Sequence, residues 1–142
     1  GVRWTQLPDL VAFADALPEL TIVLDHLGKP EVGSPDAADP ADGTPWAESL
    51  RDLAQRPNVV CKLSGLPAES RGEWTDAQMR PFLDVALDAF GPDRLLFGSD
   101  WPVSGPYGRW LDTVSSWLED RVGERHRKAV LAETAERVYG LG

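Results

Sequence analysis

The sequence has a single cysteine, Cys61, so no disulfide can form within the chain and no cysteine-based zinc site can be built. No stretch approaches the 18 or so consecutive apolar residues of a membrane span. Basic residues are few, because 14 Lys and Arg face 23 Asp and Glu and leave a net charge of −9. An acidic surface repels nucleic acid and anionic lipid. We therefore expect a protein of a reducing compartment, the cytoplasm, with neither nucleic acid nor membrane as its partner.

The chain also begins without a methionine, a basic leader or an apolar signal segment, because its first residues are Gly1-Val2-Arg3-Trp4. With 142 residues it has the length of one domain, here 1–142, whereas a complete eightfold barrel needs about 250 residues. Its content of 42% hydrophobic and 26% charged residues is typical of a globular protein. These features predict a piece of a larger fold, and the alternative is a trimmed complete protein.

Segments with helical spacing of apolar residues alternate with short apolar runs. The segment 28–45 is rich in Gly, Pro and Asp and is predicted to be a long loop. Helix starts are indicated by Thr44-Pro45 and by Thr75, which forms a capping box with Gln78. The predicted helices centre on the apolar positions Leu10 to Leu17, Trp46 to Ala54, Phe82 to Phe90, Trp110 to Leu118 and Val130 to Val138.

Three apolar runs predict parallel strands at 21–26, 59–64 and 94–99, in that order and with helices packed on one face. Ile22, Leu24 and Leu96 are expected on the other face. A doubly wound sheet and a piece of a barrel both fit this alternation. No glycine-rich dinucleotide motif or phosphate loop follows any strand, which favours the barrel.

Polar residues follow each predicted strand: His26 the first, Lys62 with Ser64 the second, and Asp100 the third. In parallel α/β folds ligands bind beyond the carboxyl ends of the strands. Adjacent strands lie about 4.8 Å apart, so these side chains can converge on one small substrate. A carboxylate beside an imidazole suits general base catalysis, oxyanion stabilisation or shared metal coordination.

Each of these residues also has a structural interpretation. His26 alone could equally be a hydrogen-bonded histidine beside a loop, and Asp100 could cap the turn before Trp101-Pro102. Ser64 more often caps a backbone group. Lys62 needs a partner because an unpaired buried lysine is costly, and Asp100 or a substrate carbonyl could serve. Asp25, expected on the face opposite His26, is given a structural role.

Three segments together resemble the amidohydrolase-related family, within the branch of fuconolactone, rhamnonolactone and pyrone-dicarboxylate lactonases. They are DHLGKP at 25–30, CKLSGL at 61–66 and FGPDRLLFGSDWP at 90–102. The resemblance extends over nearly the whole chain. It implies the C-terminal half of a (β/α)₈ barrel, with the three strands as the sixth, seventh and eighth.

The resemblance also implies roles in opening the lactone ring of a sugar acid or related carboxylated lactone. Asp100 matches the aspartate that activates water, and His26 matches the histidine that polarises the scissile carbonyl. Lys62 and Ser64 match a seventh-strand motif beside the substrate, and Trp101 is placed near the ligand. One zinc-like divalent ion shared by His26 and Asp100 is implied in the complete enzyme, or else hydrolysis without a metal.

The chain departs from the family pattern in places. Nothing corresponds to the first-strand His-x-His pair, and Thr134 stands where an asparagine is usual. Two alternatives therefore stay open. One is a metal-dependent amide hydrolase or decarboxylase of the same superfamily. The other is a non-catalytic half-barrel that associates, as a homo-oligomer or with another half, through its exposed edges.

Overall fold

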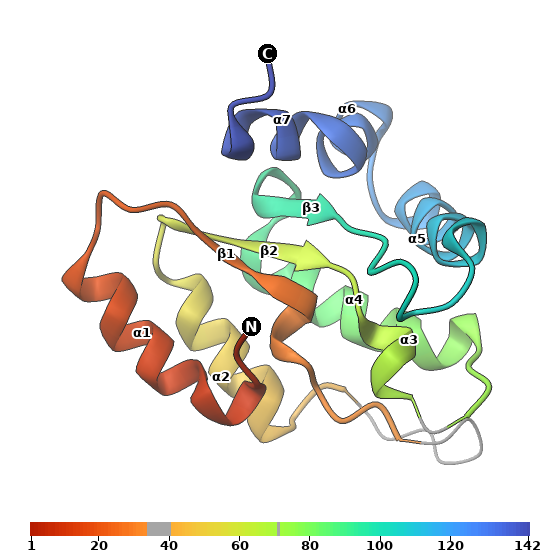
Figure 1. The fold of residues 1–142 in the computed structure, drawn as a ribbon, viewed down its shortest axis with the longest axis horizontal. Helices are drawn as coiled ribbons and strands as arrows, with labels where there is room; N and C mark the ends of the chain where they lie inside the picture. The colour runs from red at the N-terminus through yellow and green to blue at the C-terminus, as the bar shows by residue number, and fades with distance from the viewer. Residues whose placement is uncertain (34–40, 71) are drawn as a thin grey trace.

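A computed structural model describes residues 1–33, 41–70 and 72–142 (Figure 1). Part of the loop predicted at 28–45 lies outside the described residues. The helices are α1 (Leu7–Ala16), α2 (Pro45–Ala54), α3 (Leu66–Glu69), α4 (Asp76–Phe90), α5 (Tyr107–Arg121), α6 (Glu124–Lys128) and α7 (Thr134–Tyr139). The strands are β1 (Ile22–Leu24), β2 (Val59–Leu63) and β3 (Leu95–Phe97). A π-helical turn at Ala129–Glu133 joins α6 to α7.

The three strands form one parallel sheet in the order β1-β2-β3. Leu24 pairs with Cys61, which in turn pairs with Leu95. Figure 1 shows the sheet between the α1–α2 pair on one side and the C-terminal helices α6 and α7 on the other. The predicted order and direction of the strands are confirmed, although β1 and β3 are each shorter than expected.

The hydrophobic core lies between the sheet and helices α1, α2, α4 and α5. Leu24 belongs to this core. The prediction that Ile22 and Leu24 lie on the face of the sheet away from these helices, called the open face below, is therefore wrong. Parallel register places Leu24 beside Cys61, and the pleat keeps both on the helix side. Leu96 pairs with Lys62 on the opposite face, as predicted. Cys61 is fully buried, and burial raises the pKa of its thiol, which makes the side chain an unreactive core residue.

The predicted helix starts are largely confirmed. The Thr44 and Thr75 side chains accept hydrogen bonds from Ala47 N and Gln78 N. The capping box at Thr75 is incomplete, however. The Gln78 side chain instead donates to the carbonyl of Gly33. One half of the box therefore serves tertiary packing.

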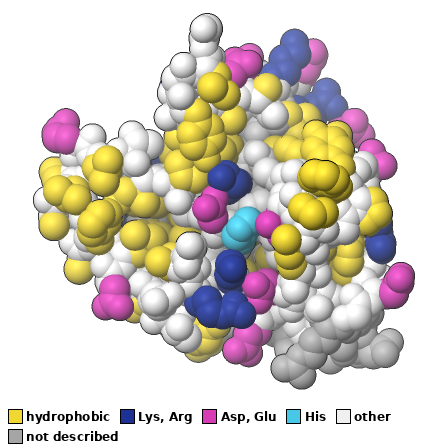
Figure 2. All heavy atoms as spheres, in the orientation of Figure 1, with side chains coloured by type: hydrophobic (Ala, Val, Ile, Leu, Met, Phe, Trp, Pro, Cys, Tyr) yellow, Lys and Arg dark blue, Asp and Glu magenta, His cyan; other side chains and the backbone are white. Residues whose placement is uncertain are grey.

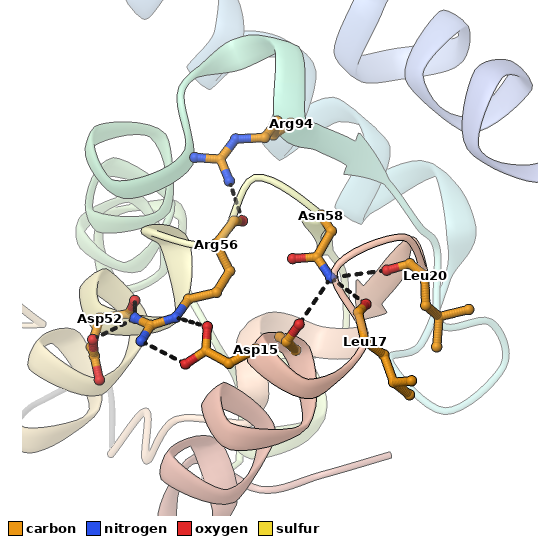
Figure 3. A network of polar contacts seen from close by, with 8 residues as sticks. Asp15, Leu17, Leu20, Asp52, Arg56, Asn58 and Arg94 are labelled. Atoms are coloured by element: carbon orange, nitrogen blue, oxygen red, sulfur yellow. Dashed lines mark hydrogen bonds and ion pairs between the residues drawn. The ribbon is translucent and has the colours of Figure 1, made fainter.

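A polar network secures the amino ends of the strands (Figure 3). Asn58, just before β2, donates to the carbonyls of Leu17 and Leu20 in the turn that leads to β1. Arg94, just before β3, donates to the carbonyls of Arg56 and Ala54. These bonds tie the three strand starts together. In parallel α/β folds ligands bind at the carboxyl ends of the strands, so this network at the opposite end stabilises the sheet.

Candidate active site

His26 lies in a tight 3₁₀ turn, Asp25–Gly28, that follows β1 directly. Its φ and ψ of 58° and 35° are left-handed, as are those of Leu27. Such a conformation is uncommon for residues other than glycine and is maintained only by its surroundings. The indole of Trp46 donates to the carbonyl of Leu27 at 2.8 Å and holds the turn from the side of α2. Apart from Gly28, no residue of this turn indicates a left-handed backbone from its type alone.

The imidazole of His26 contacts the end of β2. Its Nδ1 lies 2.8 Å from Ser64 Oγ, and Ser64 is 1% exposed. Gly65 follows with φ of +72°, and a Cβ there would lie 2.6 Å from His26 Nδ1. The expectation that Ser64 caps a backbone group is wrong, because the left-handed turn brings the ring over the end of β2.

Asp100, after β3, faces the other nitrogen of the imidazole. Its Oδ1 lies 3.7 Å from His26 Nε2, and both side chains are mostly buried. Its Oδ2 accepts a hydrogen bond from Ser104 Oγ at 2.7 Å. Asp100 also has a left-handed φ of 52°. The structure thus brings His26, Ser64 and Asp100 together, and Ser104 is a contact that sequence reasoning missed, although it lies one turn after the carboxylate.

Trp110 of α5 joins the ends of the two strands that carry Ser64 and Asp100. Its indole Nε1 donates to the carbonyl of Leu63 at 3.3 Å and to that of Gly98 at 3.1 Å, and the side chain is 1% exposed. These carbonyls lie one and two residues before the site residues. The buried indole therefore fixes the spacing of the two strand ends.

Lys62 lies on the open face of β2, but its partner differs from the expected ones. Its Nζ forms an ion pair with Asp25 Oδ1 at 2.7 Å, rather than with Asp100. The ring of Tyr139 lies beneath the ammonium group, 5.5 Å from it. Asp25 was expected to face away from His26. That inference fails because the strand ends at Leu24, and side chains no longer alternate in the turn that follows.

The contacts of Lys62 determine its charge. Partial burial lowers the pKa of the ammonium group, but hydrogen bonds to Asp25 and Tyr139 outweigh that effect, so the pKa is raised overall. Lys62 is therefore a charged and paired residue. Gly98 leaves room for its stem, since a Cβ at that position would lie 2.8 Å from Lys62 Cδ.

Trp101, predicted to lie near a ligand, is 68% exposed next to Asp100. Val103 and Tyr107 are also exposed. Figure 2, in the orientation of Figure 1, shows a histidine in the middle of the visible face, with acidic and basic side chains beside it and hydrophobic side chains on either side. A charged centre flanked by apolar surface suits a small polar substrate with a carbon skeleton.

The described residues supply only part of the metal site that the resemblance implies. His26 Nε2 and Asp100 Oδ1 could supply two ligands. Among the described residues, no group of three His, Cys, Asp or Glu side chains could hold a metal ion. Catalytic zinc sites use three protein ligands, so these residues alone do not fit zinc.

No helix in the described parts of the chain is long and apolar enough to cross a membrane.

Comparison with known proteins gives consistent matches. A family model described as "Amidohydrolase" matches residues 1–141. L-fucono-1,5-lactonase from Burkholderia multivorans is 42% identical over 96% of this chain and 48% of its own length. 4-Sulfomuconolactone hydrolase from Rhizobium radiobacter is 34% identical over 95% of this chain and 43% of its own length. The chain thus spans about half the length of these relatives.

Solved structures match equally well. A Burkholderia multivorans amidohydrolase with bound HEPES superposes with a TM-score of 0.90 and 42% identity, over 99% of this chain and 52% of that one. A second structure from the same organism, with bound zinc, superposes with a TM-score of 0.87 and 40% identity, over 99% of this chain and 51% of that one. The parallel sheet covered by helices is therefore half of a (β/α)₈ barrel. By its sequence match and its fold, the chain belongs to the amidohydrolase family.

Proposed function

We propose that this chain forms part of an enzyme that hydrolyses the lactone ring of a sugar acid or a related carboxylated lactone. The observation that carries the proposal is the Asp100 carboxylate 3.7 Å from His26 Nε2, at the carboxyl end of the sheet. The names of the similar proteins support lactone chemistry, since they include L-fucono-1,5-lactonase and 4-sulfomuconolactone hydrolase. The partner is accordingly a small lactone.

In the proposed reaction Asp100 is the general base. Its Oδ1 accepts a proton from water while the water oxygen attacks the lactone carbonyl carbon. The carbonyl oxygen becomes an oxyanion, which His26 Nε2 stabilises by a hydrogen bond. The bond between the carbonyl carbon and the ring oxygen then breaks, and Asp100 returns its proton to the ring oxygen. The product is the open hydroxy acid.

The contacts around Asp100 and Lys62 suit this division of roles. Ser104 binds Oδ2 and leaves Oδ1 on the side of His26, so the base has one oxygen available for water. Lys62 is already paired with Asp25. We therefore propose that Lys62 supports the site and contacts one side of the substrate. Trp101 would cover the exposed side of the lactone.

We propose that the complete site uses more chain than residues 1–142, because this chain spans about half the length of its relatives. We propose that β1 and β3, the outer strands of the described sheet, pair with further strands that close the barrel. Phe13, Leu17 and Leu20 are each nearly half exposed near the β1 edge and would be covered there. We refer to this assembly below as the complete barrel, and we expect residues 1–142 alone to be inactive.

The competing proposal is a metal-dependent amide hydrolase or decarboxylase, which the bound zinc in one similar structure favours. The test is turnover of the purified complete barrel on a panel of aldonolactones and the matching amides, before and after treatment with a chelator. Our proposal predicts lactone hydrolysis without amide turnover. Amide hydrolysis or decarboxylation that disappears on chelation, with no lactone turnover, would contradict it.

A further inference from the structure

The Ser64 side chain is a buried hydroxyl at the end of β2. Among the residues that the structure describes, the hydrogen-bond partner of Ser64 Oγ is His26 Nδ1, at 2.8 Å. We infer that Ser64 is a positioning residue that donates its hydroxyl hydrogen to Nδ1 and thereby keeps the His26 proton on Nε2. This inference rests on the proposed function for its catalytic consequence, but not for the hydrogen-bond direction.

Two contacts determine that direction. Asp100 Oδ1, an acceptor without a hydrogen, lies 3.7 Å from Nε2, so a hydrogen on Nε2 is attracted to it and a lone pair there is repelled. If Nδ1 carried the hydrogen instead, the buried Ser64 hydroxyl would have no acceptor for its own hydrogen among the residues that the structure describes. Both effects favour the same tautomer.

The backbone around Ser64 makes room for this contact. Gly65 has no Cβ, and one at that position would collide with His26 Nδ1 at 2.6 Å. Beneath Ser64, Gly98 lies so close that its own Cβ would be 3.1 Å from Ser64 Cβ. The two glycines allow the imidazole and the hydroxyl to approach, which explains small residues at both positions.

The chemical consequence concerns the lactone carbonyl. A neutral imidazole with its hydrogen on Nε2 donates to the carbonyl oxygen, whereas the other tautomer presents a lone pair there. The Ser64 bond therefore makes His26 an oxyanion donor and leaves the acceptance of the water proton to Asp100. In this tautomer Nε2 has no lone pair to offer a metal ion.

The test measures the tautomer directly in the complete barrel with ¹⁵N-labelled histidine, at a pH where the ring is neutral. Signals of His26 are assigned by their loss in His26→Asn. We expect Nε2 to be protonated and Nδ1 unprotonated in the parent protein and in Ser64→Thr, which keeps the hydroxyl. Ser64→Ala removes one of the two contacts that favour this tautomer, so it should raise the share of the other tautomer, although Asp100 still faces Nε2. Ser115→Ala, a partly exposed serine on α5, is the matched control and should leave the signals unchanged.

Kinetics supply the second readout. Ser64→Ala should lower kcat for the lactone on the order of 10–100-fold with KM nearly unchanged, as expected for loss of an orienting partner, and Ser64→Thr should recover most of it. A hydrogen on Nδ1 in the parent protein, or an unchanged tautomer and kcat in Ser64→Ala, would overturn the inference. If the tautomer is as stated but no lactone is hydrolysed, the proposed function fails and the positioning role stands.

Discussion

Replacing Asp100 by Asn in the complete barrel should lower kcat for lactone hydrolysis by about 10²–10⁴-fold, the usual contribution of general base catalysis. Asn keeps the shape of the side chain and can still interact with Ser104, which bonds Oδ2 at 2.7 Å. It cannot accept a proton from water at neutral pH. The loss should therefore appear in kcat more than in KM, because the lactone still binds. Steady-state kinetics on the lactone measure both constants.

The matched control is Asp112→Asn, which makes the same chemical change at an exposed position of α5. Its kcat should equal that of the parent protein. His26→Asn should also lower kcat, but less than Asp100→Asn, since groups outside this chain share in stabilising the oxyanion. A near-normal kcat for Asp100→Asn would mean that Asp100 only caps the turn before Trp101, and the base would then lie in the other half.

Trp110→Ala should lower the free energy of unfolding by about 3–5 kcal/mol, as for other large buried side chains. The side chain is 1% exposed and belongs to the core. Trp110→Phe separates packing from hydrogen bonding, because it keeps an aromatic ring and removes the indole N–H. It should cost about 1–3 kcal/mol, since the partly buried carbonyl of Gly98 loses its indole donor and that of Leu63 keeps only the Gly98 N–H. Urea unfolding of the complete barrel measures the free energy of unfolding of the parent protein, Trp110→Ala and Trp110→Phe.

Trp101→Ala provides the control for these measurements. Trp101 is 68% exposed, so its removal should change the free energy of unfolding by less than about 0.5 kcal/mol. If Trp110→Phe is as stable as the parent protein, the indole bonds do not tie the strand ends together. Lactone kinetics of Trp110→Phe add a second check, because looser strand ends should move Ser64 and Asp100 apart and lower kcat.

Much of the fold could be predicted because its elements are local. The parallel strands and the helix starts at Thr44 and Thr75 follow from apolar spacing and capping residues. Which side chains of β1 face the helices could not be predicted, because this depends on the register of β1 with β2, and no short segment encodes that register. Leu24 consequently belongs to the core rather than to the open face.

The candidate site shows the same division between local and long-range information. That His26 and Asp100 meet follows from their places after parallel strands. The pairing of Lys62 with Asp25 depends on the left-handed turn at 26–27, and the contact with Tyr139 joins residues 77 positions apart in numbering. Such contacts arise from the packing of distant elements. The sequence patterns predicted Asp100 and His26 as site residues, and the structure showed that Ser104 and Ser64 contact them.

We propose that Asp100 and His26 act together on one lactone carbonyl, Asp100 through the attacking water and His26 through the carbonyl oxygen. The most direct test is a crystal structure of the Asp100→Asn complete barrel with an unhydrolysed lactone bound. The account predicts the carbonyl oxygen within hydrogen-bonding distance of His26 Nε2, and a water molecule between residue 100 and the carbonyl carbon. A lactone bound away from these two residues, or one whose carbonyl faces neither of them, would contradict the account.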